Sequence, residues 1–402
     1  MLKKMIRTIV VATACAVMGF AATAQESTVK IGTLNPLTGP LGTSGAYAFR
    51  GHEMAVAEIN AAGGIKNLDG AMLELVNGDS QGNPSTGRAE TTRLIDEGAA
   101  IVIGAFQSSV TLDASLVTER AGIPFLDPTA VADSLTTRGL KTFLMMTVKT
   151  STGYADQIAF VAELAESLGI ENPKLALLYE SSDFGQWVAS SQMAAIAKHS
   201  NMEIIADISY EANSGDLSSQ MARIRSTKPD FLLDTSYIVD AINIARAMAR
   251  LGMDDVVQVS SGGGIFEEKY TETLGDIANG KFTLNYWSHD VNDAAAAFAV
   301  KYSEKYGDSP NGNAAQCYLA TYMVAAALEK SGSADPEALL DSLRNLKTED
   351  LPEQALVMQY GVEFNPETGY NDAAFAMATQ IQDGKHVLIW PKSIAKSEAV
   401  LP

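Results

Sequence analysis

A short stretch of the chain alternates between helical and extended signals, and this alternation restricts the fold more than any other feature. Helical periodicity at 84–97 leads into the apolar run 101–104, and a further helical stretch precedes the extended run 122–126. Strands that alternate with helices in this way form parallel sheets with right-handed crossovers. The loop 105–109 therefore follows a buried strand and precedes a helix, which is where open α/β sheets bind small ligands.

The same alternation extends over most of the chain. Further strands are predicted at 29–34, 72–76, 174–179, 203–208, 230–234 and 256–260, and further helices at 45–62, 153–168, 184–199, 216–227 and 239–251. The C-terminal part is predicted as three helices followed by two strand-like segments, at 293–306, 314–330, 336–345, 355–360 and 373–382. Asp383-Gly384 is typical of a hairpin turn. Because the pattern restarts after Met146, the sequence predicts an α/β protein with two similar halves.

The N-terminus has the pattern of an export signal. Basic residues at 3, 4 and 7 precede the apolar run 9–20, and small residues at 22–24 form a cleavage site before Gln25. The apolar run is shorter than a membrane-spanning helix requires, and no later segment reaches that length. We therefore expect residues 1–24 to be removed and the rest to be released into the periplasm. The alternatives are a buried N-terminal helix and lipid attachment through Cys15.

Charge and cysteine content exclude several classes of partner and site. The formal net charge is -19 at pH 7, and such an acidic surface disfavours nucleic acid and anionic lipid. After cleavage only Cys317 remains, so no disulfide can form within one chain, and its apolar helical surroundings predict a small core residue. The four histidines lack metal-ligand spacing, so neither a metal nor a cofactor is expected.

The sequence shows no catalytic constellation around the predicted pocket. It contains no G-x-S-x-G nucleophile motif, and the glycine run 262–264 lacks the Lys-Ser/Thr that follows in a phosphate-binding loop. A receptor for a small molecule therefore fits better than an enzyme. Two alternatives stay open: an exported α/β hydrolase, which would need a nucleophile with a base in reach, and a ligand-sensing receptor domain.

Seven segments, taken together and in order, resemble one known family. They are Val29–Pro40, Arg50-Gly51, Glu58–Ile65, Ile103–Ser109, Gly122–Pro124, Leu135–Gly139 and Lys228–Asp230. On these segments the chain is similar to the periplasmic binding proteins of ABC transporters that carry branched-chain amino acids, the leucine/isoleucine/valine-binding protein family.

The resemblance implies a type I periplasmic binding protein fold, with two doubly wound parallel-sheet lobes joined by a three-crossing hinge. It divides the chain into 25–146 and 283–352 for lobe 1, and 147–282 and 353–402 for lobe 2. It implies no catalysis and no cofactor. The partners it implies are a small-molecule ligand and the membrane permease of an ABC transporter, and we expect the receptor to be a monomer.

The resemblance also implies where the ligand binds. A serine and backbone amides at one strand end would hold the ligand carboxylate, a second clamp would follow the next strand, and aromatic residues would come from the second lobe. With neighbouring polar and glycine positions, the predicted ligand-binding residues are Ser44, Gln107, Ser108, Ser109, Thr129, Ala130, Val131, Tyr154, Phe184, Tyr237, Gly262 and Gly263.

One residue that the resemblance implies is missing. The family's acid that pairs with the ligand ammonium belongs in the loop 260–264, which here reads Ser-Ser-Gly-Gly-Gly. An ammonium buried without a partner is costly. Either Glu267 or another acid approaches the ligand, or the ligand has no α-ammonium group and is a carboxylate, an amide or a similar polar molecule. We favour the second interpretation.

Overall fold

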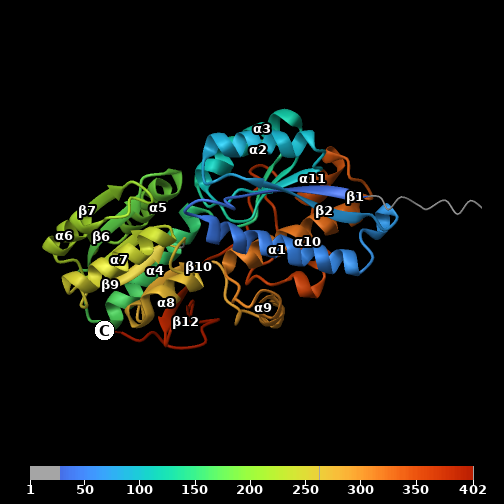
Figure 1. The fold of residues 1–402 in the computed structure, drawn as a ribbon. Coiled ribbons are helices and arrows are strands. Elements are labelled where there is room, and N and C mark those ends of the chain that lie inside the picture. Colours follow the sequence, from blue (N-terminus) through green and yellow to red (C-terminus); the bar gives the residue numbers. More distant parts are fainter. Residues whose placement is uncertain (1–27, 262, 402) are drawn as a thin grey trace, which may run out of the picture.

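A computed structural model describes residues 28–261 and 263–401 of the chain. The predicted export signal and its cleavage site lie outside these residues, as does Gly262. Among the helices of the described part, none is long and apolar enough to cross a membrane. The chain forms two α/β lobes that lie side by side, each built on its own sheet (Figure 1).

The sheet of lobe 1 contains five parallel strands in the order β2-β1-β3-β4-β5. These strands are β1 (Thr28–Asn35), β2 (Met72–Asp79), β3 (Ile101–Gly104), β4 (Phe125–Asp127) and β5 (Phe143–Met145). The helices packed around them are α1 (Gly42–Ala61), α2 (Pro84–Asp96), α3 (Ser108–Ala121), α9 (Asp293–Tyr306), α10 (Gly312–Ser331) and α11 (Pro336–Arg344). Every residue of β3, β4 and β5 is buried, as expected for central strands covered on both faces.

The sheet of lobe 2 has the order β12-β11-β10-β9-β8-β6-β7. Its strands are β6 (Lys174–Glu180), β7 (Glu203–Tyr210), β8 (Phe231–Thr235), β9 (Val257–Ser261), β10 (Phe282–Asn285), β11 (Met377–Gln382) and β12 (Lys385–Trp390). The helices of this lobe are α4 (Thr150–Ser167), α5 (Asp183–Ile196), α6 (Ser218–Thr227), α7 (Ile238–Leu251) and α8 (Glu268–Leu274). Strands β6 to β10 pair in parallel, and β11 and β12 extend the sheet as an antiparallel hairpin.

The chain passes between the two sheets three times, after β5, after β10 and before β11. Hydrogen bonds join these crossings to one another. The Asn371 amide N–H donates to the Met145 carbonyl at 2.9 Å, and its side-chain Nδ2 donates to Met146 O at 3.2 Å. The Trp287 indole donates to the carbonyl of Val357 at 2.9 Å. The crossings therefore lie side by side, and such an arrangement permits the lobes to move about a hinge.

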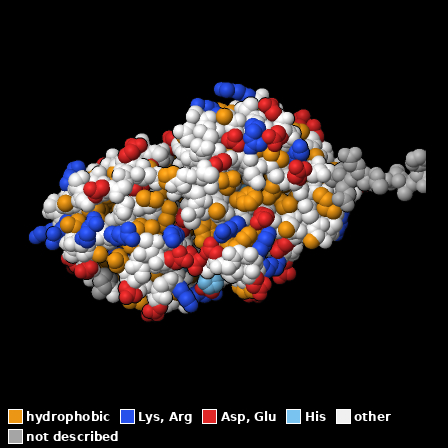
Figure 2. Space-filling view, in the orientation of Figure 1, with side chains coloured by type: hydrophobic (Ala, Val, Ile, Leu, Met, Phe, Trp, Pro, Cys, Tyr) orange, Lys and Arg blue, Asp and Glu red, His pale blue; other side chains and the backbone are white. Residues whose placement is uncertain are grey.

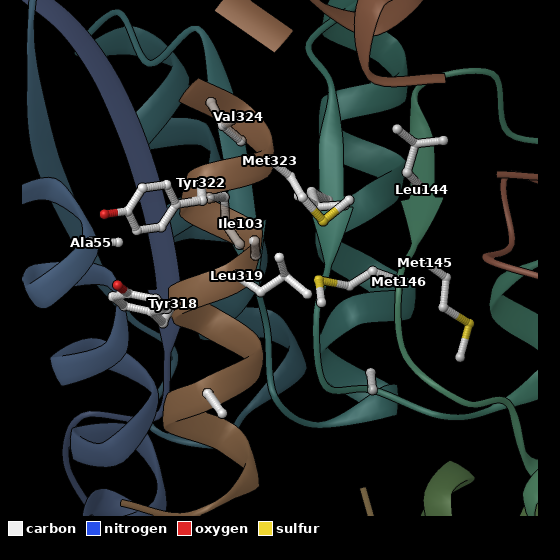
Figure 3. Close-up of a cluster of buried hydrophobic side chains, with 14 of the residues drawn as sticks. Ala55, Ile103, Leu144, Met145, Met146, Tyr318, Leu319, Tyr322, Met323 and Val324 are labelled. Carbon is white, nitrogen blue, oxygen red and sulfur yellow. The ribbon is translucent and has the colours of Figure 1, made fainter. Parts of the chain in front are cut away.

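Helix α10 forms much of the core of lobe 1, because nearly all its residues are buried. Figure 3 shows Tyr318 and Tyr322 pointing from α10 toward α1, whereas Leu319 and Met323 point toward the strands. The two tyrosine hydroxyls donate to one carboxylate oxygen of Glu58 on α1, at 2.6 and 2.8 Å. Each ring is thus buried while its polar end keeps a partner.

Most predicted elements are confirmed, and the differences concern short segments. The strand predicted at 355–360 is wrong: a 3₁₀ turn occupies 353–355, and no strand follows until β11 among the described residues. The hairpin turn at Asp383-Gly384 is confirmed, with φ of 50° and 75°. Cys317 is a buried core residue, as predicted, and burial raises the pKa of its thiol.

Charged side chains of both signs are interspersed with apolar ones over the face shown in Figure 2, and neither sign forms a continuous surface there. The acidic excess of the sequence is therefore spread over this face, which fits a role in solubility better than a role in binding one large cationic partner.

Candidate functional site

A cavity of about 40 Å³ lies between the lobes. Both sheets contribute the loops at the carboxyl ends of their parallel strands, the position where open α/β sheets hold ligands. The residues that line the cavity are Phe106, Ser108, Thr129, Ala130, Val131, Phe184, Tyr237, Gly263, Phe266, Tyr286, Asn313 and Gln316. None of these is charged, and five carry aromatic rings.

The loop between β3 and α3 forms one wall. Phe106 has φ of 72°, a left-handed conformation that is unfavourable for a residue with a side chain, and its ring lines the cavity. Helix α3 then begins at Ser108, and Gln107 at its N-cap makes no side-chain capping bond. The first amides of α3 therefore point toward the cavity end of the helix, and the Ser108 hydroxyl accepts a hydrogen bond from Ala132 N–H at 3.3 Å.

The loop after β4 forms the adjoining wall. Asp127, at the end of β4, is fully buried, and its carboxylate accepts the amide N–H of Thr129 at 3.0 Å and that of Ala130 at 2.8 Å. Burial raises the pKa of Asp127 to about 8, against the opposing effect of these two bonds. Asp127 therefore shapes the loop, and the amides of Thr129 and Ala130 are already engaged within the protein.

Aromatic residues of lobe 2 face this wall. Phe184 lies in the first turn of α5, and Tyr237 is the N-cap of α7. Their ring centroids are 5.6 Å apart, and the Tyr237 ring lies 6.2 Å from that of Phe106 in lobe 1. Burial raises the pKa of Tyr237 well above its ordinary value, so its hydroxyl stays neutral. Direct contact between rings of opposite lobes means that the cleft is closed.

The floor comes from the hinge and from the start of α10. The Tyr286 hydroxyl lies 3.1 Å from that of Tyr154, which is fully buried behind the cavity. Gln316 donates to Thr147 Oγ1 at 2.7 Å. Asn313 is only 4% exposed, and its Nδ2 has no hydrogen-bond partner within the described residues. Asn313 therefore brings an unused donor to the cavity.

The glycines after β9 allow the backbone to approach α7 closely. A Cβ on Gly263 would lie 2.3 Å from the Ser236 carbonyl oxygen, and one on Gly264 would lie 2.5 Å from Ile238 N. Gly263 also has φ of 68°, which favours glycine. Larger residues at these two positions would push the loop away from the cavity wall.

A second interlobe contact lies outside the cavity. The Ser44 hydroxyl on α1 donates to Glu267 Oε1 at the start of α8, and both residues are almost fully buried. Burial raises the pKa of Glu267 to about 8, whereas the bond from Ser44 opposes this shift. The second carboxylate oxygen of Glu267 has no hydrogen-bond partner within the described residues. Glu267 thus closes the lobe interface and does not line the cavity.

The structure brings together seven of the residues predicted for the site, which are Ser108, Thr129, Ala130, Val131, Phe184, Tyr237 and Gly263. Four others do not line the cavity, namely Ser44, Gln107, Ser109 and Tyr154. Gly262 is not among the described residues. Sequence reasoning missed five lining residues, which are Phe106, Phe266, Tyr286, Asn313 and Gln316. Of these, only Phe106 belongs to a loop that the strand-to-helix pattern had singled out.

Comparisons with known proteins agree with this architecture. Residues 28–385 match the family described as "Periplasmic binding protein". The chain is 32% identical over 387 residues to Leu/Ile/Val-binding protein homolog 8 of Brucella suis biovar 1, with 93% of each chain covered.

Two solved structures have the same fold. The branched-chain amino acid transporter substrate-binding protein LivJ of Streptococcus pneumoniae, in complex with isoleucine, matches with a TM-score of 0.78 and 25% identity, over 91% of this chain and all of that one. A solute-binding protein of Rhodopseudomonas palustris BisB5, in complex with 3,4-dihydroxybenzoic acid, matches with a TM-score of 0.78 and 18% identity, over 93% and 98% of the two chains.

Proposed function

The chain belongs to the periplasmic binding protein family, and we propose that it is the receptor of an ABC transporter, which captures one small polar ligand between its lobes and delivers it to a membrane permease. Its relatives are substrate-binding proteins, and the chain is accordingly a binding protein and not an enzyme.

One observation carries the proposal: the cavity is lined by the strand ends of both lobes, so a movement of the lobes apart would open it to a ligand. The three adjacent crossings supply the hinge for that movement. A ligand that contacts both lobes would stabilise the closed arrangement by its differential affinity for it. Closure would then create the surface that the permease recognises.

The remaining parts of the proposal follow from the sequence. The predicted export signal at 1–24 would place the receptor in the periplasm, where we propose that it acts as a monomer. The division into lobe 1 (25–146 and 283–352) and lobe 2 (147–282 and 353–402) is the arrangement that we propose to move about the hinge. The fold leaves the ligand open, since LivJ was solved with isoleucine and the Rhodopseudomonas protein with 3,4-dihydroxybenzoic acid.

A thermal-unfolding screen of purified protein tests the proposed function. Small carboxylates, amides and amino acids are first added one at a time, and chromatography shows whether each compound is recovered unchanged. A compound that binds is then tested again at about a hundred times its dissociation constant. A receptor ligand should add about 2.7 kcal/mol of stability at that excess, bind with one-to-one stoichiometry and be recovered unchanged. Turnover of any stabilising compound would contradict the proposal and favour the hydrolase alternative.

A further inference from the structure

We propose that the cleft is built for a monocarboxylate that bears no ammonium group and has a flat, apolar body. This inference rests on the proposed function and names the class of ligand for the same cavity. It follows from three features of the cavity: the absence of charge from its lining, the position of the buried acids Asp127, Glu180 and Glu267 outside that lining, and the placement of rings opposite a helix N-terminus.

The lining offers no partner for a cation. All twelve described residues that line the cavity are uncharged. Moving an ammonium from water into such a site costs several kcal/mol unless a carboxylate or several acceptors compensate it. An α-amino acid would bring one ammonium into the cavity, whereas its deaminated analogue would not.

Three buried acids, Asp127, Glu180 and Glu267, accept hydrogen bonds from the protein and lie outside the lining. Asp127 accepts the amides of Thr129 and Ala130. Glu180, the last residue of β6, is fully buried and accepts the amides of Ser182 and Gly185, both at 2.7 Å. Glu267 accepts the hydroxyl of Ser44, and none of the three lines the cavity. Asp127 Oδ2 and Glu267 Oε2 have no hydrogen-bond partner within the described residues, but neither side chain lines the cavity, so an ammonium there would pair with one of these acids only if that acid moved.

The cavity does offer donors to an anion. The N-terminus of α3 carries amides without intrahelical partners and a partial positive charge, and Ser108 lies at its first turn. Asn313 supplies a second, independent donor, because its buried Nδ2 lines the cavity and has no partner in the described part of the chain. A carboxylate between α3 and α10 would satisfy both sets of donors.

The rest of the ligand would lie among rings. Phe106 and Tyr237 approach from opposite lobes, Phe184 lies beside Tyr237, and Phe266 and Tyr286 complete the lining. Ring faces favour a flat body through offset stacking. The cavity of about 40 Å³ is smaller than the roughly 150 Å³ engineered cavity that holds benzene, so a ligand with one ring would fit only if the lobes lay further apart than they do in this structure.

Calorimetry with matched pairs of compounds tests the proposal. Protein is unfolded, dialysed and refolded to remove any retained ligand, and then titrated with benzoate, with 3-phenylpropionate against L-phenylalanine, and with 4-methylpentanoate against L-leucine. At least one of the two deaminated acids should bind, and it should bind at least tenfold more tightly than its own amino acid. Tighter binding of either amino acid would overturn the ligand class while leaving the receptor function intact.

Two asparagine variants on the same part of the chain sharpen the test. Asn313→Asp adds a negative charge to the lining without a change of shape, and it should weaken binding of the acid at least tenfold. Asn311→Asp is the matched control, because Asn311 caps α10 and does not line the cavity. Thermal unfolding establishes that both variants fold. Equal affinities of the two variants for the acid would contradict the proposed position of the carboxylate.

Native mass spectrometry separates failure of the ligand class from failure of the receptor function. It is applied to protein purified without unfolding. If no compound of the panel binds but the protein retains one small molecule, the ligand class is wrong and the receptor function stands. If no compound binds and no molecule is retained, both proposals fail.

Discussion

Phe106 shows how a single residue can reveal a functional loop. Its positive φ is an unfavourable conformation that costs of order 1–3 kcal/mol. The surrounding strands β3 and β4 are buried, and they hold the loop in place. The result is that the Phe106 ring enters the cleft and approaches Tyr237 of the other lobe. Strain at this position is therefore consistent with a role in binding.

The first prediction compares two neighbouring serines. Ser108 lines the cavity and Ser109 does not, although both were predicted from the sequence to bind the ligand. Ser108→Ala should weaken binding of the ligand by roughly tenfold to a hundredfold, because a hydrogen bond to a charged group contributes about 1.5–3 kcal/mol.

Ser109→Ala is the control and should change affinity less than about threefold. Calorimetry with the compound that the thermal screen identifies measures both. Equal losses in the two variants would show that the ligand lies further along α3 than the cavity indicates.

A local sequence pattern was enough to predict some of the residues that line the cavity. Ser108, Phe184 and Tyr237 each follow a buried strand at the start of a helix, and a strand-to-helix pattern can be read locally. Asn313 and Tyr286 could not be found in this way. They belong to α10 and to a hinge crossing, and they reach the cleft only because residues far apart in sequence come together there.

Elements of the fold differ in how strongly the sequence specified them. Long helices with regular periodicity, such as α10, were predicted with nearly the observed ends. β5 and β10 were not predicted, since a run of three or four buried residues carries no periodicity; β3 and β4 are as short and were predicted from the apolar runs that border helical stretches. The apolar run at 355–360 resembled a strand, but its residues lie in a hinge crossing, where Trp287 binds the carbonyl of Val357.

The second prediction concerns the close packing of α1 against α10. A Cβ on Gly51 would lie 2.1 Å from the Ala314 carbonyl oxygen, so Gly51→Ala forces the helices apart. We expect a loss of about 1–3 kcal/mol in the free energy of unfolding, as is usual for overpacking.

Gly312→Ala is the matched control, because its nearest neighbour would be the Trp287 Cβ at 3.5 Å, an ordinary contact. Urea unfolding followed by circular dichroism measures both variants. If Gly51→Ala is as stable as Gly312→Ala, the two helices do not pack as tightly as described.

Closure of the whole molecule should depend on pH through Glu267. This carboxyl is 0% exposed in the closed form, where burial raises its pKa to about 8. The charged and titratable groups around the same interface are Glu268, Asp308, Arg50 and His386. The pKa of Glu268 is raised to about 7 by its hydrogen bond with Asp308 and by burial, and burial lowers that of His386 to about 4.

The third prediction follows from the sign of these shifts. When the lobes part, Glu267 meets water and its pKa returns toward the ordinary value of about 4.3. Closure then takes up a proton. The contribution of Glu267 to the free energy of closure is therefore fully present below this ordinary pKa and is lost as the pH rises toward 8. Glu268 acts in the same direction. Affinity for the ligand should therefore fall between about pH 5 and 8.

Glu267→Gln provides the control for this pH dependence. Glutamine imitates the protonated acid. Near pH 5 the variant and the native protein should therefore have the same affinity for the ligand, and near pH 8 the variant should have the higher affinity. Calorimetry at several pH values measures the profile. Affinity that rises with pH in the native protein would indicate instead that ionised Glu267 pairs with a cation of the ligand.

Hinge closure over a retained ligand is the central claim, and small-angle X-ray scattering tests it most directly. The first sample is protein purified without unfolding. The second is the same protein after it has been unfolded, dialysed and refolded. The third is the refolded protein after the small molecules released during unfolding have been added back. We predict that the radius of gyration increases from the first sample to the second and returns to its first value in the third. An identical radius in all three, with a small molecule detected in the first, would contradict the account.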